Sequence, residues 1–146
     1  MNAPFHARGE KLYDVLHLLN EMRIKGIERE CLETIKEGAK ALHPREFLAL
    51  LSVGRDRSII SEIVMLPQMT YGKRHASFNI YMAPVDFSIV GTVHSHPSGK
   101  PIPSRDDLIT FSKNGIIHII IAYPYDDASW KAYDYNGKEV KLEIIE

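Results

Sequence analysis

Residues 91–107 read GTVHSHPSGKPIPSRDD, and the rest of the chain is interpreted around this stretch. An apolar run leads into His94-Ser95-His96, and Pro97 then ends the pattern. Side chains alternate along a β-strand, so His94 and His96 are expected to project from the same face. Two imidazoles at this spacing can bind one cation, and imidazole is a frequent ligand of zinc. The stretch therefore predicts one part of a metal site at the end of a strand.

The segment that follows predicts a third ligand. Residues 97–103 contain three prolines and one glycine, so we expect neither a helix nor a paired strand there. A helical pattern begins at Ser104, and Asp107 lies one turn in. Ser-x-x-Asp is also typical of a capping box, which stabilises a helix start and has no catalytic role. The combination favours a hydrolytic zinc site, because a rigid loop joins two imidazoles on the same face to a carboxylate at a helix start.

Composition limits the class of protein. The chain has 146 residues, of which 45% are hydrophobic and 25% charged, as expected for one globular domain with a substantial core. The formal net charge of −1 indicates no nucleic-acid partner. A single cysteine, Cys31, excludes an intrachain disulfide and a cysteine-rich zinc finger. The N-terminus does not resemble a signal peptide, and no apolar run reaches the ~20 residues of a membrane span. We therefore expect a cytoplasmic protein with no membrane partner.

The first half of the chain predicts two helices followed by strands. Residues 10–22 have an amphipathic pattern, and we expect this helix to pack on the domain or to form a dimer surface. Residues 23–28 are predicted to be a short edge strand or an extended connector. A second helix is predicted over residues 29–42, with Cys31 on its buried stripe, and Pro44 stops it.

Three extended segments are expected next. Residues 45–53 form an apolar run that opens on Glu46, and its length favours a strand buried on both faces. A second strand is predicted at 58–66 and a loop at 67–73. Residues 76–82 are predicted to be extended, with a helical turn as the alternative.

The second half of the chain predicts one helix and several strands around the histidine pair. The expected elements are the histidine strand, a helix from Ser104 to a C′ glycine at Gly115, a central strand at 116–122, a strand at 130–135, a type I′ hairpin at Asn136-Gly137 and a last strand at 140–144. Together they predict an α/β fold with a mixed, largely antiparallel sheet. The site is expected where a strand leads into a helix.

The site residues carry a family resemblance. The pattern His94-Ser95-His96-Pro97-x6-Ser104-x2-Asp107, with Glu46 upstream, matches every position of the JAMM signature of the JAB1/MPN metalloprotease family. The resemblance extends from about Ile24 to the C-terminus. It implies a single MPN domain of cytidine-deaminase-like architecture at 24–146, after an N-terminal helical extension at 1–23. The loop after His96 is similar to that of compact prokaryotic, especially archaeal, members.

The resemblance also implies roles for these residues. His94, His96 and Asp107 would hold one zinc ion per chain and leave its fourth position to water. Glu46 would act as general base and acid, and Ser104 would stabilise the oxyanion. Three protein ligands with one open position are the usual pattern of a catalytic zinc site, so these roles are chemically consistent.

Other residues compete for these roles. Glu33, Glu37 and Glu62 are alternative bases, although Glu33 and Glu37 belong on the solvated side of a helix. Asp106 competes with Asp107 for the metal, and the Ser-x-x-Asp spacing favours Asp107. His118 lies in an isoleucine run and is interpreted as a core histidine with a hydrogen-bond partner.

The resemblance implies a zinc-dependent isopeptidase that removes ubiquitin-like modifiers from lysine side chains or linear fusions. The modifier's C-terminal tail is expected to bind by strand addition near residues 76–82. One alternative is release of cysteine or another residue from the tail of a ubiquitin-like sulfur carrier. A second is a non-catalytic MPN scaffold, although scaffolds typically lack parts of the signature. The RadC branch has a similar Pro-Ser-Gly loop, but the near-neutral charge gives its link to DNA repair no support. The N-terminal helix is the first place to look for a homodimer contact.

Overall fold

The computed structural model describes residues 23–65 and 88–146. The helix predicted at 10–22, the loop at 67–73 and the extended segment at 76–82 lie outside these residues. The described elements, in chain order, are β1 (Gly26–Glu28), α2 (Arg29–Leu42), β2 (Leu48–Val53), β3 (Ile59–Val64), β4 (Ile89–His96), α3 (Arg105–Lys113), β5 (Ile117–Ala122), β6 (Trp130–Asp134), β7 (Glu139–Val140) and β8 (Glu143–Ile145).

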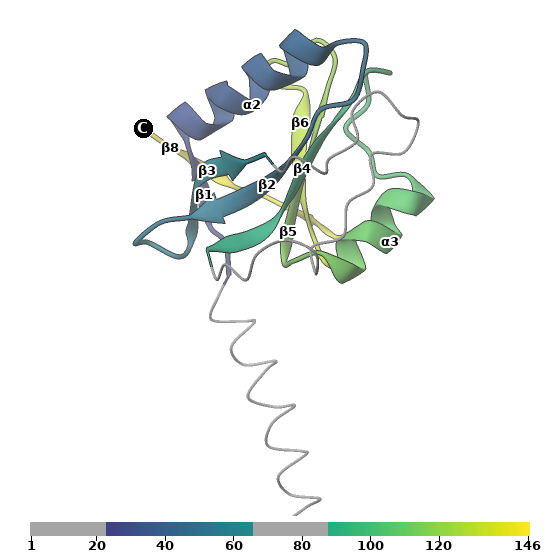
Figure 1. The fold of residues 1–146 in the computed structure, drawn as a ribbon. Helices are drawn as coiled ribbons and strands as arrows, with labels where there is room; N and C mark the ends of the chain where they lie inside the picture. Colours follow the sequence, from purple (N-terminus) through teal and green to yellow (C-terminus); the bar gives the residue numbers. More distant parts are fainter. Residues whose placement is uncertain (1–22, 66–87) are drawn as a thin grey trace, which may run out of the picture.

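The described strands form one eight-stranded sheet in the order β7-β6-β5-β4-β2-β3-β1-β8 (Figure 1). The pairs β2–β3, β2–β4, β5–β6 and β6–β7 are antiparallel, whereas β4–β5, β1–β3 and β1–β8 are parallel. The predicted mixed, largely antiparallel sheet is confirmed. The histidine strand β4 lies inside it, between β2 and β5.

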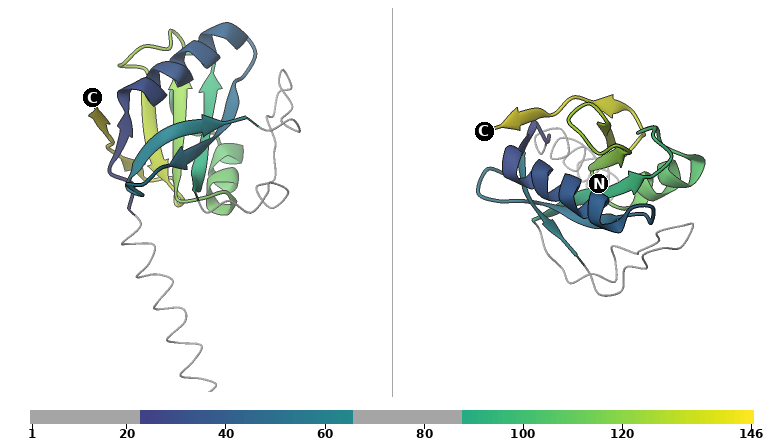
Figure 2. Two further views of the ribbon diagram at one scale, coloured as in Figure 1. Left: turned by 60° about the vertical axis from the view of Figure 1, so that its left-hand side comes forward. Right: turned by 90° about the horizontal axis from the view of Figure 1, so that it is seen from above.

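Helix α2 covers one face of the sheet (Figure 2). Its apolar side chains recur at helical spacing and pack on alternate residues of the strands. The main members of this core are Cys31, Leu32, Ile35, Ala39, Ala49, Leu51, Val93, Ile119 and Ile121. Cys31 is a core residue, as predicted, and burial raises the pKa of its thiol to about 12. This thiol therefore stays protonated and inert at neutral pH.

Helix α3 packs on the opposite face and forms a smaller core there. Phe111 of α3 is fully buried and clusters with Ile120 of β5 and Tyr133 of β6. The Phe111 ring stacks on His118 at a centroid distance of 4.4 Å. Gly115 follows the Asn114 cap with a φ of 116°, so it is the predicted C′ glycine. This small core supports the end of the sheet that carries the histidine pair.

The structure corrects two expectations about the strands. Residues 26–28 do not form an edge strand, because β1 lies between β3 and β8. The last predicted strand is split: β7 pairs with β6 at one edge, and β8 crosses to pair with β1 at the other. Alternation of apolar and polar residues determines which face a side chain occupies but not which strand is its neighbour.

The hairpin between β6 and β7 is confirmed, but its turn type differs from the prediction. A type I′ turn needs positive φ at both central residues, whereas Gly137 has a φ of 80° and Asn136 is not among the described residues with positive φ. The Gly137 N–H donates to the Asp134 carbonyl at 3.0 Å. This is a three-residue loop in which glycine follows an ordinary turn.

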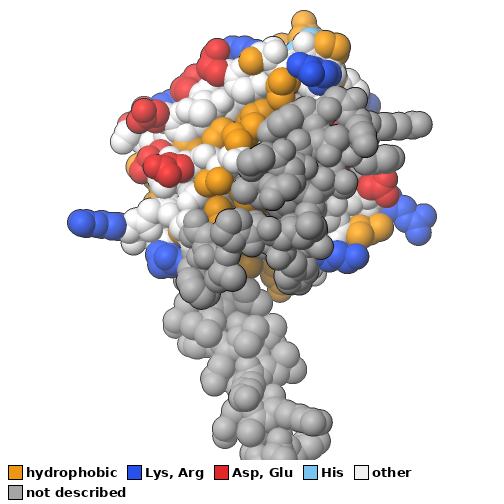
Figure 3. Space-filling view, in the orientation of Figure 1, with side chains coloured by type: hydrophobic (Ala, Val, Ile, Leu, Met, Phe, Trp, Pro, Cys, Tyr) orange, Lys and Arg blue, Asp and Glu red, His pale blue; other side chains and the backbone are white. Residues whose placement is uncertain are grey.

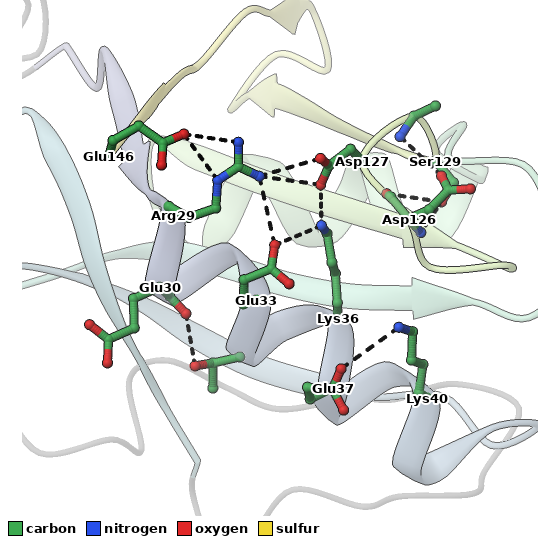
Figure 4. Close-up of polar contacts among 12 residues, drawn as sticks. Arg29, Glu30, Glu33, Lys36, Glu37, Lys40, Asp126, Asp127, Ser129 and Glu146 are labelled. Carbon is green, nitrogen blue, oxygen red and sulfur yellow. Dashed lines mark hydrogen bonds and ion pairs between the residues drawn. The ribbon is translucent and has the colours of Figure 1, made fainter.

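Charged side chains tie α2 to the C-terminal part of the chain (Figure 4). Lys36 is only 7% exposed, and its ammonium group contacts the carboxylates of Glu33 and Asp127. Arg29 pairs with Asp127 at 3.3 Å and with Glu146 at 3.1 Å. The buried Lys36 charge is thus paired on two sides, and the loop between β5 and β6 is held against α2.

The surface shows no broad patch of one charge on the described part visible in Figure 3. Acidic side chains lie along α2 in this view, and Lys and Arg side chains are scattered around the rim. Within residues 23–65 and 88–146, no helix has the length and apolar character needed to span a membrane.

Candidate metal centre

His94 and His96 lie at the end of β4 and share a face of the sheet, as the alternation predicts. His94 is 8% exposed, and His96 is half-buried. Their Nε2 atoms are 3.0 Å apart. Within the described residues, His94, His96 and Asp107 are the group whose ligand atoms converge closely enough to hold a metal ion, all within 4.8 Å of one another.

Asp107 reaches the histidines from the first turn of α3. Its Oδ1 lies 3.2 Å from Nε2 of His94, and its Oδ2 lies 3.1 Å from Nε2 of His96. The capping box is also present, because Ser104 Oγ accepts from the Asp107 N–H and Asp107 Oδ2 accepts from the Ser104 N–H. The two interpretations of Ser-x-x-Asp are therefore compatible, since the cap fixes the carboxylate that faces the imidazoles.

The donor set fits zinc. Two imidazole nitrogens and a carboxylate oxygen are ligands that catalytic zinc sites use. Donors bound tetrahedrally at zinc's bond lengths of 2.0–2.1 Å lie about 3.3 Å apart. The two Nε2 atoms are 3.0 Å apart, and Asp107 places Oδ1 3.2 Å from His94 and Oδ2 3.1 Å from His96, so nitrogen and carboxylate donors converge at about the separation that a zinc ion requires.

A backbone carbonyl sets the orientation of His96. Its Nδ1 lies 3.0 Å from the carbonyl oxygen of Lys100. A carbonyl only accepts hydrogen bonds, so Nδ1 carries the proton and Nε2 is left as the lone-pair donor for a metal. The loop at 97–103 thus holds the ring in the tautomer that metal binding requires.

The charges of the three side chains favour a cation. Burial alone would raise the pKa of Asp107, but the hydrogen bonds from His94 and His96 outweigh it and hold that pKa well below its usual range. Burial would lower the pKa of His96, yet the Asp107 carboxylate and the Lys100 carbonyl raise it overall. Asp107 is therefore an anion at any physiological pH, as a metal ligand must be.

Glu46 lies just before β2, and the pairing of β2 with β4 brings it to the histidines. Leu48 is opposite His94, and the Ser95 N–H donates to the Phe47 carbonyl at 2.9 Å. If this antiparallel register continues two residues beyond the Leu48–His94 pair, Glu46 lies opposite His96 and on the same face of the sheet. Its negative charge contributes to the raised pKa of His96. Glu46 is half-buried, so part of its side chain is still reachable from solvent.

The competing residues lie elsewhere. Glu33 and Glu37 are on the exposed side of α2, and Asp106 is not among the converging donors. His118 is fully buried, with Nδ1 2.8 Å from the Thr92 hydroxyl and Nε2 3.1 Å from the Phe111 carbonyl. Burial lowers its pKa to about 4, so it is a neutral core histidine, as predicted.

Sequence reasoning missed two residues that form hydrogen bonds to the segments around the site. Ser95 is fully buried, and its Oγ accepts the Phe47 N–H at 2.7 Å, which holds the residue next to Glu46 against β4. Tyr133 donates its hydroxyl to the Pro101 carbonyl at 2.6 Å. A polar residue between two histidines in an otherwise apolar strand was the available signal for Ser95, because buried polar groups need partners.

Comparison with known proteins identifies the family of the chain. Residues 28–133 match the family model described as prokaryotic homologues of the JAB domain. A "probable metalloprotease" of Haloferax volcanii is 31% identical over 139 residues, which cover 90% of this chain and 86% of the relative.

Two solved structures have the same fold. One, described as JAMM, a metalloprotease-like zinc site in the proteasome and signalosome, is 41% identical with a TM-score of 0.66, covering 84% of this chain and 99% of its own. A JAB1/MPN domain protein from Archaeoglobus fulgidus is 43% identical with a TM-score of 0.67, covering 83% and 99%. This chain therefore belongs to the compact prokaryotic branch of the JAMM/MPN metalloprotease family, hydrolases whose cofactor is zinc.

Proposed function

We propose that the chain is a zinc-dependent isopeptidase that removes ubiquitin-like modifiers from their conjugates. In this proposal His94, His96 and Asp107 are the zinc ligands, Glu46 is the general base and Ser104 is the oxyanion donor. The observation that carries it is the convergence of three donor atoms at the end of β4, with Glu46 continuing the β2 register toward His96. The family supplies the substrate class.

Glu46 is assigned the proton transfers. Bound zinc supplies a Lewis acid that makes water nucleophilic near neutral pH. Glu46 takes a proton from the attacking water and later gives it to the leaving amine, so the scissile amide is converted to a carboxylate and a free amine. Its half-buried position supports this role, because the carboxylate must face both the site and the substrate.

Ser104 is assigned the stabilisation, by a hydrogen bond, of the negative charge that develops on the scissile carbonyl oxygen. Its Oγ accepts from the Asp107 N–H, so its own proton is free to point to the substrate. The side chain is exposed at the start of α3, where a substrate can reach it. Loss of a single oxyanion donor typically costs about 2.7–4 kcal/mol of transition-state stabilisation.

The test combines metal analysis with a Glu46→Gln variant. We expect about one zinc per chain in both proteins, and a kcat about 10²–10⁴-fold lower in the variant, the usual contribution of a general base. Glu62→Gln is the matched control, because Glu62 is an exposed carboxylate on β3, separated from β4 by β2. A wild-type chain without zinc would overturn the whole proposal, and full activity in Glu46→Gln would remove Glu46 from its role.

The substrate is tested with two probes. One is a ubiquitin-like modifier joined to a lysine side chain, and the other is a ubiquitin-like carrier extended by a cysteine. We expect faster cleavage of the lysine conjugate. Preference for the cysteine-extended carrier would assign the site to sulfur-carrier processing, and cleavage of neither with zinc bound would favour a scaffold.

We further propose that the protein is cytoplasmic and self-associates through residues 10–22. The amphipathic pattern there supports a contact that buries Leu12, Leu16 and Leu19. Light scattering of the full chain and of a Leu16→Asp variant tests this. Equal masses for the two proteins would exclude the contact.

A further inference from the structure

The loop between His96 and Ser104 holds two parts of the site in place although it contains no helix or strand. Among the described residues, three hydrogen bonds anchor its backbone. The Gly99 N–H donates to the His96 carbonyl at 3.3 Å, the Lys100 carbonyl accepts from His96 Nδ1 at 3.0 Å, and the Pro101 carbonyl accepts from the Tyr133 hydroxyl at 2.6 Å. The last anchor comes from outside the loop, from β6.

Tyr133 is itself held firmly. It is 5% exposed and pairs with His118 in the β5–β6 register. Its ring stacks on Phe111 at a centroid distance of 6.0 Å and an interplanar angle of 24°. Because packing leaves the ring little freedom, the position of its hydroxyl is determined by the sheet and by α3, and the loop must conform to it.

The anchor at Pro101 acts on the neighbouring Lys100 carbonyl. The proline ring locks the φ angle of residue 101 at about −65°, so the ψ angle of Pro101 is the one soft backbone angle left between the Lys100 and Pro101 carbonyls. A hydrogen bond that fixes the Pro101 carbonyl therefore restricts the Lys100 carbonyl as well. The Lys100 carbonyl is the group that holds His96 in its metal-binding tautomer.

We propose that Tyr133 is a positioning residue for the zinc site, acting through Pro101 and Lys100 on the imidazole of His96. The proposal rests on the zinc-ligand set of the proposed function. Without the Tyr133 hydroxyl the loop loses this anchor from β6, and His96 samples orientations that cannot bind metal. Zinc then binds more weakly, because part of the binding energy is used to order the ring.

The test measures zinc affinity by chelator competition in Tyr133→Phe, which removes the hydroxyl and keeps the packed ring. Groups that orient metal ligands typically contribute 10–100-fold in affinity, and we expect about tenfold weaker binding. Tyr125→Phe is the matched control, since Tyr125 is 2% exposed and its hydroxyl lies 2.7 Å from His43 Nδ1 on the α2 side. The control should bind zinc within twofold of wild type.

Thermal unfolding of both metal-free variants distinguishes a local effect on the zinc site from a loss of overall stability. Equal melting temperatures together with tenfold weaker zinc binding in Tyr133→Phe alone support the proposal. Equal zinc affinity in the two variants overturns it. If the wild-type protein binds no zinc, the proposed function fails. If the wild-type protein binds zinc and Tyr133→Phe binds it with the same affinity, only the positioning role is refuted.

A measurement on wild type keeps the proposal testable if Tyr133→Phe does not fold. Coupling between two sites is reciprocal, so zinc must strengthen the Tyr133–Pro101 hydrogen bond by the same factor by which that bond strengthens zinc binding. In NMR of protein with isotope-labelled tyrosine, we expect zinc to slow the exchange of the Tyr133 hydroxyl proton with water about tenfold. The Tyr125 hydroxyl should not change. Exchange of Tyr133 that is unaffected by zinc would overturn the proposal.

Discussion

Gly91 is the position where a single added methyl group should damage the metal centre through the sheet. It lies in β4 opposite Leu51 of β2 and Ile117 of β5. A Cβ built on Gly91 would lie 1.5 Å from the Ile117 carbonyl oxygen, whereas real Cβ atoms essentially never come within 3.0 Å of another heavy atom. A Gly91→Ala chain must therefore separate β4 and β5 by about 1.5 Å, and the obstructing atom is backbone that cannot rotate away.

The expected destabilisation follows from this overlap. Overpacking of a core costs about 1–3 kcal/mol, and a clash with backbone in a central strand belongs at the upper end of that range. A loss of about 3 kcal/mol would lower the melting temperature by about 10 °C. Because His94 is three residues further along β4, zinc binding should weaken too. Thermal unfolding of metal-free protein and chelator competition measure the two effects.

Gly54→Ala is the matched control for this variant. A Cβ at Gly54 meets only the Ser61 Oγ, at 3.4 Å, which is ordinary contact. Its stability should stay within about 0.5 kcal/mol of wild type. If Gly91→Ala were as stable as Gly54→Ala, the close approach of β4 to β5 described here would be wrong.

Two further predictions concern His118 and Ser104. Burial lowers the pKa of His118 from 6.5 to about 4, so between these values the unfolded chain binds a proton that the folded chain does not. Stability should fall as the pH decreases from about 6.5 to 4, by up to about 3 kcal/mol. Urea midpoints at pH 7 and 5 should show this loss in wild type and less of it in His118→Gln; equal losses would exclude the role. Ser104→Ala should lose about 1 kcal/mol of cap stability and about 10²–10³ in kcat, whereas Ser104→Gly should keep most of the stability and still lose kcat. Normal kcat in Ser104→Gly would remove Ser104 from catalysis.

The parts of the fold that were predictable depend on neighbours in the chain. Helix α2 has the predicted bounds because its apolar residues recur at helical spacing and Pro44 follows. The sequence did not predict which strands pair with each other in the sheet. Residues 140–144 alternate as one strand would, yet β7 and β8 lie at opposite edges of the sheet. The pairing of β7 and β8 depends on which edges of the sheet remain unpaired once the other strands have assembled.

The sequence by itself determined that His94 and His96 share a face and that Asp107 follows at a helix start. Alternation places His94 and His96 on one face, and the capping box places Asp107 one turn into α3, since both follow from local backbone stereochemistry. Only the tertiary structure decided what lies around them. Ser95 is hydrogen-bonded to Phe47, 48 residues away in the sequence, and Tyr133 to Pro101, 32 residues away. Such contacts form only when the whole sheet buries its faces together, so no local pattern contains them.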